Sequence, residues 1–178
     1  MLALDTDRLI LRPWRDGDRA PYAAMMADPQ VGYWLGRTLT ESQADAQVDR
    51  FAAHLEAWDF GFLAVERRDD GAFLGAAGLL ALTPDSPLAP GVEIGWRFTR
   101  EVWGAGYATE AARAVLADGF GRVDLSEIVA FTARTNLRSR AVMERLDMAR
   151  RPELDFEHPA LEPHHILRSH VVYALRRA

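Results

Sequence analysis

Apolar residues recur along the chain with two different periods, and these periods predict strands that alternate with helices. A period of two is typical of strands, whereas a period between three and four is typical of helices. Leu9 and Leu11 follow the first pattern, and Val48, Phe51 and Leu55 follow the second. The predicted strands cover residues 7–13, 60–67, 73–82, 92–98, 128–132 and 170–175; the predicted helices, with their caps, cover residues 16–26, 40–58, 108–119 and 136–146.

Turn and loop signals separate these elements without dividing the chain into parts. Asp70-Gly71 is a hairpin signal between two predicted strands. Three prolines make the segment 83–91 a predicted loop. The sequence shows no internal repeat, linker or low-complexity stretch. We therefore predict one domain over residues 1–178, of the α/β or α+β class.

Composition excludes several kinds of chemistry. The chain has no cysteine and no lysine, so all 21 of its basic residues are arginine. This excludes disulfides, thiolate nucleophiles, Schiff-base catalysis and the lysine-bearing phosphate loop of nucleotide hydrolases. The net charge of −5 argues against a nucleic-acid partner.

The chain also lacks the usual signals for export or membrane insertion. No apolar run approaches the ~20 residues that a membrane span needs. The N-terminus carries Asp5 and has no long apolar centre, so it does not resemble a signal peptide. We expect a cytoplasmic protein with no membrane partner.

A glycine-bearing turn between the 92–98 strand and the next helix is the most informative segment. Its residues are Trp103, Gly104, Ala105, Gly106, Tyr107, Ala108 and Thr109. Glycines allow a tight turn and a close approach of the backbone to a ligand. The unpaired N–H groups and the dipole of the following helix would favour a bound pyrophosphate. A plain connecting turn is the alternative, and a dinucleotide fingerprint is not met, because Thr109 stands where Gly or Ala is expected.

This segment resembles the acetyl-coenzyme A loop of the GNAT superfamily of N-acetyltransferases, whose pattern is Gln/Arg-x-x-Gly-x-Gly/Ala. Trp103 stands at the first position, Gly106 at the glycine and Ala108 at the last. Tryptophan followed by G-x-G-Y-A-T-E-A is similar to the branch of the ribosomal-protein N-terminal acetyltransferases. The opening TDRLILRP, the segment from Asn136 to Leu146 and the ending HVVYAL resemble the same branch. Asp147 departs from it, since the family usually has glycine there, and must tolerate a left-handed conformation.

The resemblance implies a GNAT fold and acetyl transfer to an amine. The expected fold is a mixed, mostly antiparallel twisted sheet of six to seven strands, with helices on both faces and two strands splayed at the coenzyme site. The implied cosubstrate is acetyl-CoA, and the implied acceptor is a protein N-terminus or a small-molecule amine. With no cysteine for an acetyl-enzyme, we expect direct transfer in a ternary complex.

Glu93, at the start of the 92–98 strand, is the predicted general base. The resemblance places an acidic residue here in many relatives, and a partly buried carboxylate can deprotonate an amine. A solvent-facing residue or a structural ion pair is the alternative. The resemblance also runs the pantetheine arm along the strand that ends with Trp96 and Phe98. The backbone N–H of Phe98 is then the expected oxyanion donor, and both side chains either line the acetyl pocket or pack in the core.

Asn136, the only asparagine, precedes a predicted helix and is expected to cap it. The resemblance adds a hydrogen bond to the pantetheine amide. Many relatives carry a tyrosine acid where this chain has Met143, which leaves Ser139 as the predicted proton donor. Arg138 and Arg140 either meet the 3′-phosphate or lie on a solvated helix face.

Other interpretations of the sequence stay open. No histidine spacing fits a metal site, so we expect none; His158 is expected to border the acceptor cleft. The loops at 29–39, 83–91 and 151–168 are expected to set acceptor specificity. A non-catalytic acyl-CoA-binding module, another donor such as succinyl-CoA, and a homodimer formed near the C-terminal strand are the remaining possibilities.

Overall fold

The computed structural model describes residues 2–177 and contains a nine-stranded sheet. Among the described strands, β5 and β6 alone form a parallel pair, and the other neighbours are antiparallel. The two-residue strand β8 (Phe156–Glu157) pairs with β9 outside the main order. That order is β1 (Leu4–Asp5), β2 (Leu9–Arg12), β3 (Phe62–Arg67), β4 (Phe73–Ala81), β5 (Val92–Phe98), β6 (Glu127–Ala133), β9 (Ser169–Arg176) and β7 (Ala149–Arg150).

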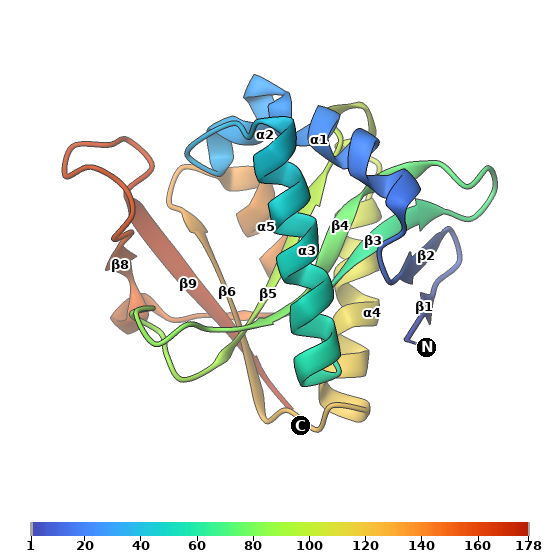
Figure 1. The fold of residues 1–178 in the computed structure, drawn as a ribbon. Coiled ribbons are helices and arrows are strands. Elements are labelled where there is room, and N and C mark those ends of the chain that lie inside the picture. The colour runs from blue at the N-terminus through green and yellow to red at the C-terminus, as the bar shows by residue number, and fades with distance from the viewer. Residues whose placement is uncertain (1, 178) are drawn as a thin grey trace.

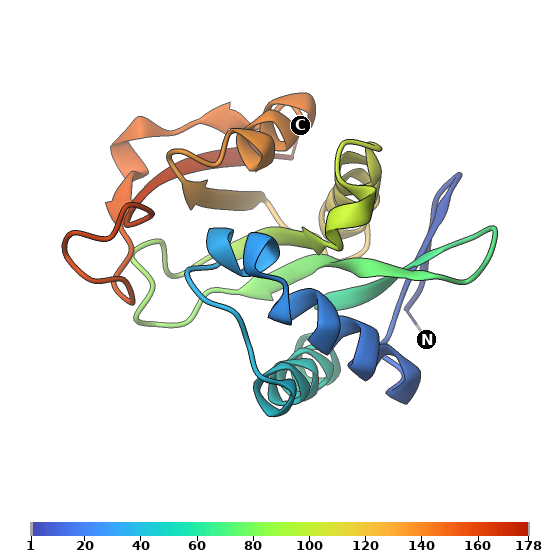
Figure 2. The same ribbon diagram turned by 90° about the horizontal axis from the view of Figure 1, so that it is seen from above.

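Helices cover both faces of this sheet (Figures 1 and 2). The helices α1 (Arg19–Ala27) and α3 (Glu41–Trp58) lie on one face, and α4 (Tyr107–Gly121) and α5 (Leu137–Arg145) lie on the other. The short helix α2 (Pro29–Trp34) lies at the top of the view in Figure 1, at the end of the sheet where β5 and β6 are apart. None of the helices in the described part of the chain is long and apolar enough to cross a membrane.

Each face has its own hydrophobic core, because alternate residues of a strand point to opposite sides. On the α4 side, Leu63, Ile94 and Ile128 pack with the helix residues Ala111 and Val115. On the α1–α3 side, the buried residues Tyr22, Met26, Val48, Phe51, Phe62 and Ala76 pack together. Burial of two apolar faces stabilises the sheet between its helices.

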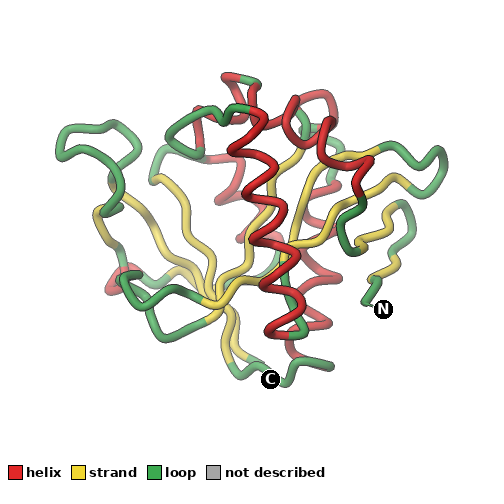
Figure 3. Tube along the Cα trace, viewed as in Figure 1, coloured by secondary structure: helices red, strands yellow, loops and turns green. Residues whose placement is uncertain are grey.

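The sheet opens between β5 and β6. These strands share one register pair, Glu93 with Val129, whereas β6 pairs with β9 along its whole length. β5 is likewise paired with β4 along its whole length, from Ala81–Val92 to Gly75–Phe98. The edge of β5 beyond Glu93 therefore has no neighbouring strand, and Figure 3 shows the two strands separating from a common base.

The predicted fold class is confirmed, and the local predictions hold at most helix starts. Thr40 caps α3 in a capping box with Gln43, and Asn136 caps α5 by accepting a hydrogen bond from the N–H of Ser139 at 3.2 Å. Asp147 has the left-handed φ of 57° that its place after α5 requires.

The structure contains several short elements that the sequence patterns did not predict. Helix α2 occupies part of the predicted 29–39 loop, because Asp28 accepts a hydrogen bond from the N–H of Gln30 and Pro29 begins the new helix. Three two-residue strands, β1, β7 and β8, raise the strand number above six or seven. A strand of two residues has no readable period, so tertiary pairing alone defines it.

A glycine in β4 provides a test of this packing. A Cβ on Gly78 would lie 2.0 Å from the backbone oxygen of Gly61, which cannot move without disturbing β3. We expect Gly78→Ala to lower the free energy of unfolding by about 1–3 kcal/mol, as overpacking does, measured by chemical denaturation. The matched control is Gly121→Ala at the end of α4, where a Cβ meets nothing within 4 Å. Equal stability of the two variants would contradict the packing.

Candidate active site

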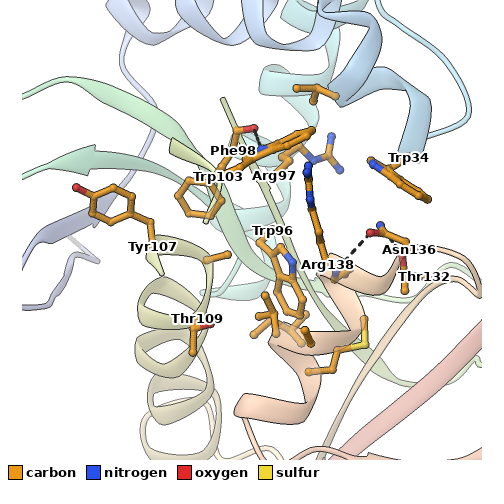
Figure 4. Close-up of a pocket in the computed structure, with 18 of the residues that line it drawn as sticks. Trp34, Trp96, Arg97, Phe98, Trp103, Tyr107, Thr109, Thr132, Asn136 and Arg138 are labelled. Atoms are coloured by element: carbon orange, nitrogen blue, oxygen red, sulfur yellow. Dashed lines mark hydrogen bonds between the residues drawn. The ribbon is translucent and has the colours of Figure 1, made fainter. Parts of the chain in front are cut away.

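A cleft of about 2190 Å³ lies where the sheet opens. Its walls come from β5, β6, the turn before α4, the first turns of α4 and α5, and α2 (Figure 4). The residues predicted to form the site all line it: Glu93, Trp96, Phe98, Trp103, Gly104, Ala105, Gly106, Tyr107, Ala108, Thr109, Asn136 and Ser139. The fold therefore brings together segments that are far apart in the sequence.

The turn before α4 presents free backbone donors to the cleft. Gly104 and Gly106 have φ values of 82° and 84°, which glycine adopts without steric cost. Within residues 2–177, five backbone N–H groups of this segment have no hydrogen-bond partner: those of Gly104, Gly106, Tyr107, Ala108 and Thr109. The first N–H of the helix that is hydrogen-bonded is that of Glu110. Unpaired N–H groups at a helix start and in the glycine turn before it are donors of the kind that fit a pyrophosphate.

An ion pair holds this turn against the first hairpin. Glu110 accepts hydrogen bonds from the hydroxyl of Thr6 at 2.6 Å and from the backbone N–H of Arg8 at 2.9 Å. The guanidinium of Arg8 also pairs with Glu110, donates to the carbonyl of Ala105 at 3.1 Å and stacks on the ring of Tyr107. These contacts lower the pKa of Glu110 against the opposing effect of burial. The turn is thus fixed before any ligand binds.

The free edge of β5 also presents backbone groups to the cleft. The N–H of Thr99 donates to the carbonyl of Leu74 on β4 at 2.9 Å. Because hydrogen-bonding direction alternates along a strand, the N–H groups of Phe98 and Trp96 point to the opposite side, toward the opening. Both are available to a ligand, and Trp96 lies one step nearer to Glu93. The family resemblance had implied Phe98 alone as the donor.

The aromatic side chains of β5 have different environments. Phe98 is 5% exposed and packs in the α4-side core. Trp96 is half-buried, packs against the same core and forms part of the cleft wall. Trp103 is fixed by a hydrogen bond from its indole N–H to the carbonyl of Phe98 at 2.9 Å, drawn in Figure 4. Both side chains thus pack in the core and line the cleft, and Trp96 is the more exposed of the two.

Glu93 has the environment of a proton acceptor. Its side chain is half-buried in the cleft, and within the described chain it has no hydrogen-bond or ion-pair partner at contact distance. Burial raises the pKa of Glu93 to about 7, against the opposing effect of the positive charge of Arg97. A carboxyl group with this pKa is half ionised near neutral pH, as general-base catalysis requires. The alternative of a structural ion pair is wrong.

The start of α5 supplies polar groups to the opposite wall. Asn136 is buried, and its amide nitrogen donates to the hydroxyl of Thr132 at 3.0 Å while its oxygen caps α5. One amide hydrogen is left for a ligand. Ser139 and the buried Met143 both line the cleft, and Met143 has no proton to give. Arg140 does not line the cleft, and its guanidinium donates hydrogen bonds to the hydroxyl of Tyr173 and to the carbonyl of Arg134.

The acceptor side contains residues that the sequence pattern did not single out. Trp34 of α2 and Phe131 of β6 line the cleft, together with His170 of β9. His158, which was expected to border it, does line it, with its ring centroid 4.8 Å from that of His170. Burial lowers the pKa of both histidines, so they favour the neutral form. The sequence could not predict that these two histidines are neighbours, because the pairing of β8 with β9 brings them together.

Comparisons with known proteins agree with this architecture. The family model of the acetyltransferase (GNAT) domain matches residues 8–149. The Bacillus subtilis N-acetyltransferase YoaA is 32% identical over 142 residues, which cover 79% of this chain and 78% of that protein. A crystal structure of an acetyltransferase from Agrobacterium tumefaciens superposes with a TM-score of 0.81 at 25% identity, covering 99% of this chain and 95% of the other.

A third structure shares the fold. It is the ribosomal L7/L12 alpha-N-protein acetyltransferase RimL in complex with coenzyme A, with a TM-score of 0.79, 13% identity and 98% coverage of both chains. The opened sheet with a glycine turn at a helix start is the fold of an acetyltransferase of the GNAT class. The chain belongs to the GNAT acetyltransferase family, whose members use acetyl-CoA, and the predicted family is confirmed.

Proposed function

We propose that this protein is an N-acetyltransferase that moves the acetyl group of acetyl-CoA directly onto a primary amine. The observation that carries the proposal is the position of Glu93, whose raised pKa is matched to proton abstraction, in the same cleft as five free backbone donors. The free donors suit the phosphates of a coenzyme thioester, and the base suits an amine. The unpaired edge of β5 lies between them and suits the arm that joins the phosphates to the thioester.

Each part of the cleft has a role in binding the coenzyme. The turn at 104–109 holds the pyrophosphate through its N–H groups. The unpaired edge of β5 accepts the pantetheine arm as an added strand, since the N–H groups of Phe98 and Trp96 face the opening. The free amide hydrogen of Asn136 adds a hydrogen bond from the other wall. Trp96 borders the acetyl group.

The reaction follows from these positions. Glu93 takes one proton from the acceptor ammonium, and the neutral nitrogen attacks the thioester carbonyl carbon. The N–H of Phe98 or Trp96 stabilises the resulting oxyanion. The carbon–sulfur bond then breaks, and the coenzyme thiolate takes a proton from the Ser139 hydroxyl, which is restored by the proton that the attacking nitrogen loses. The products are an acetylated amine and free coenzyme A.

Direct transfer predicts a particular kinetic pattern. The chain has no cysteine, so an acetyl-cysteine intermediate is excluded. Initial velocities, measured by thiol release at varied acetyl-CoA and amine, are expected to give intersecting reciprocal lines. Parallel lines would show an acetyl-enzyme and contradict the proposal.

The pKa of Glu93 predicts the pH dependence of kcat/KM for the amine. The ionised carboxylate is the active form, so kcat/KM rises with pH and levels off above the pKa of about 7. At one pH unit below the pKa, about a tenth of the carboxyl groups are ionised, and the rate is about tenfold lower. In Glu93→Gln, kcat/KM should no longer rise with pH over this range. A wild-type profile that stays flat from pH 5.5 to 8 would contradict the role.

One observation favours a second function. Met143 stands where a tyrosine acid is common among relatives, and it is 1% exposed with no donor. A module that binds acyl-CoA without catalysis would tolerate this change. Use of another acyl donor, such as succinyl-CoA, would keep the same chemistry and need a wider acyl pocket.

The cytoplasmic location, the homodimer and the single domain over residues 1–178 stay predictions from the sequence.

A further inference from the structure

Arginines without an acidic partner gather in the cleft. Within residues 2–177, most arginines have a carboxylate within 4.0 Å, as surface arginines usually do. Those that line the cleft without one are Arg37, Arg97, Arg113, Arg138 and Arg145. The cleft is lined by six arginines, these five and Arg8, and by four carboxylates, those of Asp5, Asp7, Glu93 and Glu110, so a chain with a net charge of −5 has a cleft with an excess of positive charge.

Arg97 differs from the other four by its position. It lies on β5, four residues after Glu93, and alternation along the strand puts both on the α1–α3 face. Contacts confirm that face: the guanidinium of Arg97 lies over the rings of Phe51 and Phe62, at 5.5 and 5.2 Å from their centroids. The phosphate-binding turn lies beyond the end of β5. Figure 4 shows Arg97 and Arg138 extending into the cleft from β5 and α5.

The guanidinium of Arg97 is held at one corner. Its Nη1 donates to the hydroxyl of Tyr22 and to the side-chain oxygen of Gln47, both at 3.0 Å. Tyr22 in turn donates to Gln47 at 2.5 Å. Burial raises the pKa of Tyr22, so the hydroxyl stays neutral. Both acceptors are therefore uncharged, and they fix Arg97 without neutralising its charge.

The remaining donors of Arg97 are free and reachable. Its Nε–H and Nη2–H groups have no hydrogen-bond partner in the described chain. No buried side-chain nitrogen or oxygen among those residues lacks a partner, so these two nitrogens are not fully buried, and Arg97 lines the cleft. The Nε–Nη2 edge is one of the two edges with which arginine binds a carboxylate through a pair of parallel hydrogen bonds.

The ring of Phe62 covers the strand between the two charged groups and lines the cleft with them. Gly95 separates Glu93 from Arg97 on the same face, and a Cβ there would lie 2.7 Å from the ring of Phe62. A strand rises about 3.3 Å per residue, so the two Cα atoms are about 13 Å apart. Two long side chains at the two ends of this ring can hold the two ends of one small molecule that lies against it.

We infer that the acceptor is an amine that carries a carboxylate, bound with its nitrogen at Glu93 and its carboxylate on the free edge of Arg97. This rests on the proposed function and names its substrate class. Acceptors with several positive charges, such as polyamines, are disfavoured by the unpaired arginines around them. Tyr22 and Gln47 are positioning residues, since they reach the acceptor only through Arg97.

The experiment compares acceptors with and without the carboxylate. Glycine, leucine, phenylalanine, glycylglycine and the ω-amino acids from β-alanine to 6-aminohexanoate are each assayed beside their carboxamides, with spermidine as a polycation. Thiol release from acetyl-CoA gives kcat and KM. The best acid is expected to exceed its own amide by about 100-fold in kcat/KM, since the amide leaves a charged donor pair unsatisfied.

Variants test whether Arg97 is responsible. In Arg97→Met the ratio of acid to amide should fall to about threefold or less through a higher KM for the acid, while the KM for acetyl-CoA stays within about twofold. The matched control is Arg50→Gln, which removes an exposed arginine of α3 that has no carboxylate partner in the described chain and does not line the cleft; it should keep the wild-type ratio.

Each result has a distinct meaning. If acids and amides react equally in the wild type, or if spermidine is the best acceptor, the inference is wrong and the proposed function stands. If Arg97→Met raises the KM for acetyl-CoA and leaves the ratio unchanged, Arg97 belongs to the coenzyme site and the inference is wrong. If no amine releases thiol although acetyl-CoA binds in calorimetry, the proposed function fails and the inference fails with it.

Discussion

Glu93→Gln is expected to lower kcat by about 10²- to 10⁴-fold, the usual contribution of a positioned general base. The amide keeps the size of the side chain and cannot accept the amine proton. Glu93 is half-buried and within the described chain has no ion-pair partner, so its replacement should leave the fold intact. The affinity for acetyl-CoA, measured by isothermal calorimetry, should stay within about twofold, because in the proposed function backbone groups further along the cleft bind the coenzyme.

Glu56→Gln is the matched control for this variant. Glu56 is exposed on α3, has no ion-pair partner in the described chain and does not line the cleft, so its replacement should leave kcat unchanged. If Glu93→Gln keeps the wild-type kcat, Glu93 is not the base. If the wild type binds acetyl-CoA but shows no turnover that the variant could lose, the chain is a binding module.

Gly106→Glu is expected to weaken acetyl-CoA binding by at least about 100-fold, close to complete loss in calorimetry. The φ of Gly106 is 84°, and its N–H and those that follow converge on the anion site. In the proposed function the pyrophosphate binds at this turn, so a glutamate there adds a repelling negative charge, and its backbone strain distorts the turn. The strain costs about 1–2 kcal/mol, so the protein should remain folded with a modestly lower Tm.

Gly71→Glu provides a control of the same chemistry. Gly71 lies in the β3–β4 turn with a φ of 72°, and a Cβ added there would meet no atom within 4 Å. The substitution adds the same charge and comparable strain away from the cleft, so acetyl-CoA affinity should be unchanged. Adenosine 3′,5′-bisphosphate, which lacks the pyrophosphate, should bind only weakly to every variant. Normal acetyl-CoA affinity in Gly106→Glu would refute the phosphate role of the turn.

The sequence by itself determined the long elements and the glycine turn before α4. Periodic apolar residues defined the main strands and helices, because burial of one face forces that period on the chain. Thr40 and Asn136 marked helix starts, because a cap is a local hydrogen bond between near neighbours. The free donors of the 104–109 turn are equally local, since a helix start leaves its first N–H groups unpaired wherever it lies.

Tertiary structure alone decided which residues face one another across the cleft. The opening between β5 and β6 depends on a single register pair at Glu93, which no local pattern encodes. The pKa of Glu93 depends on burial by distant segments and on the charge of Arg97. In the sequence Arg97 is an ordinary strand arginine; its free edge arises because Tyr22 of α1 and Gln47 of α3 occupy only one corner. Local periodicity reports which face of an element is buried, whereas burial, charge and partner are set by segments that meet only when the chain folds.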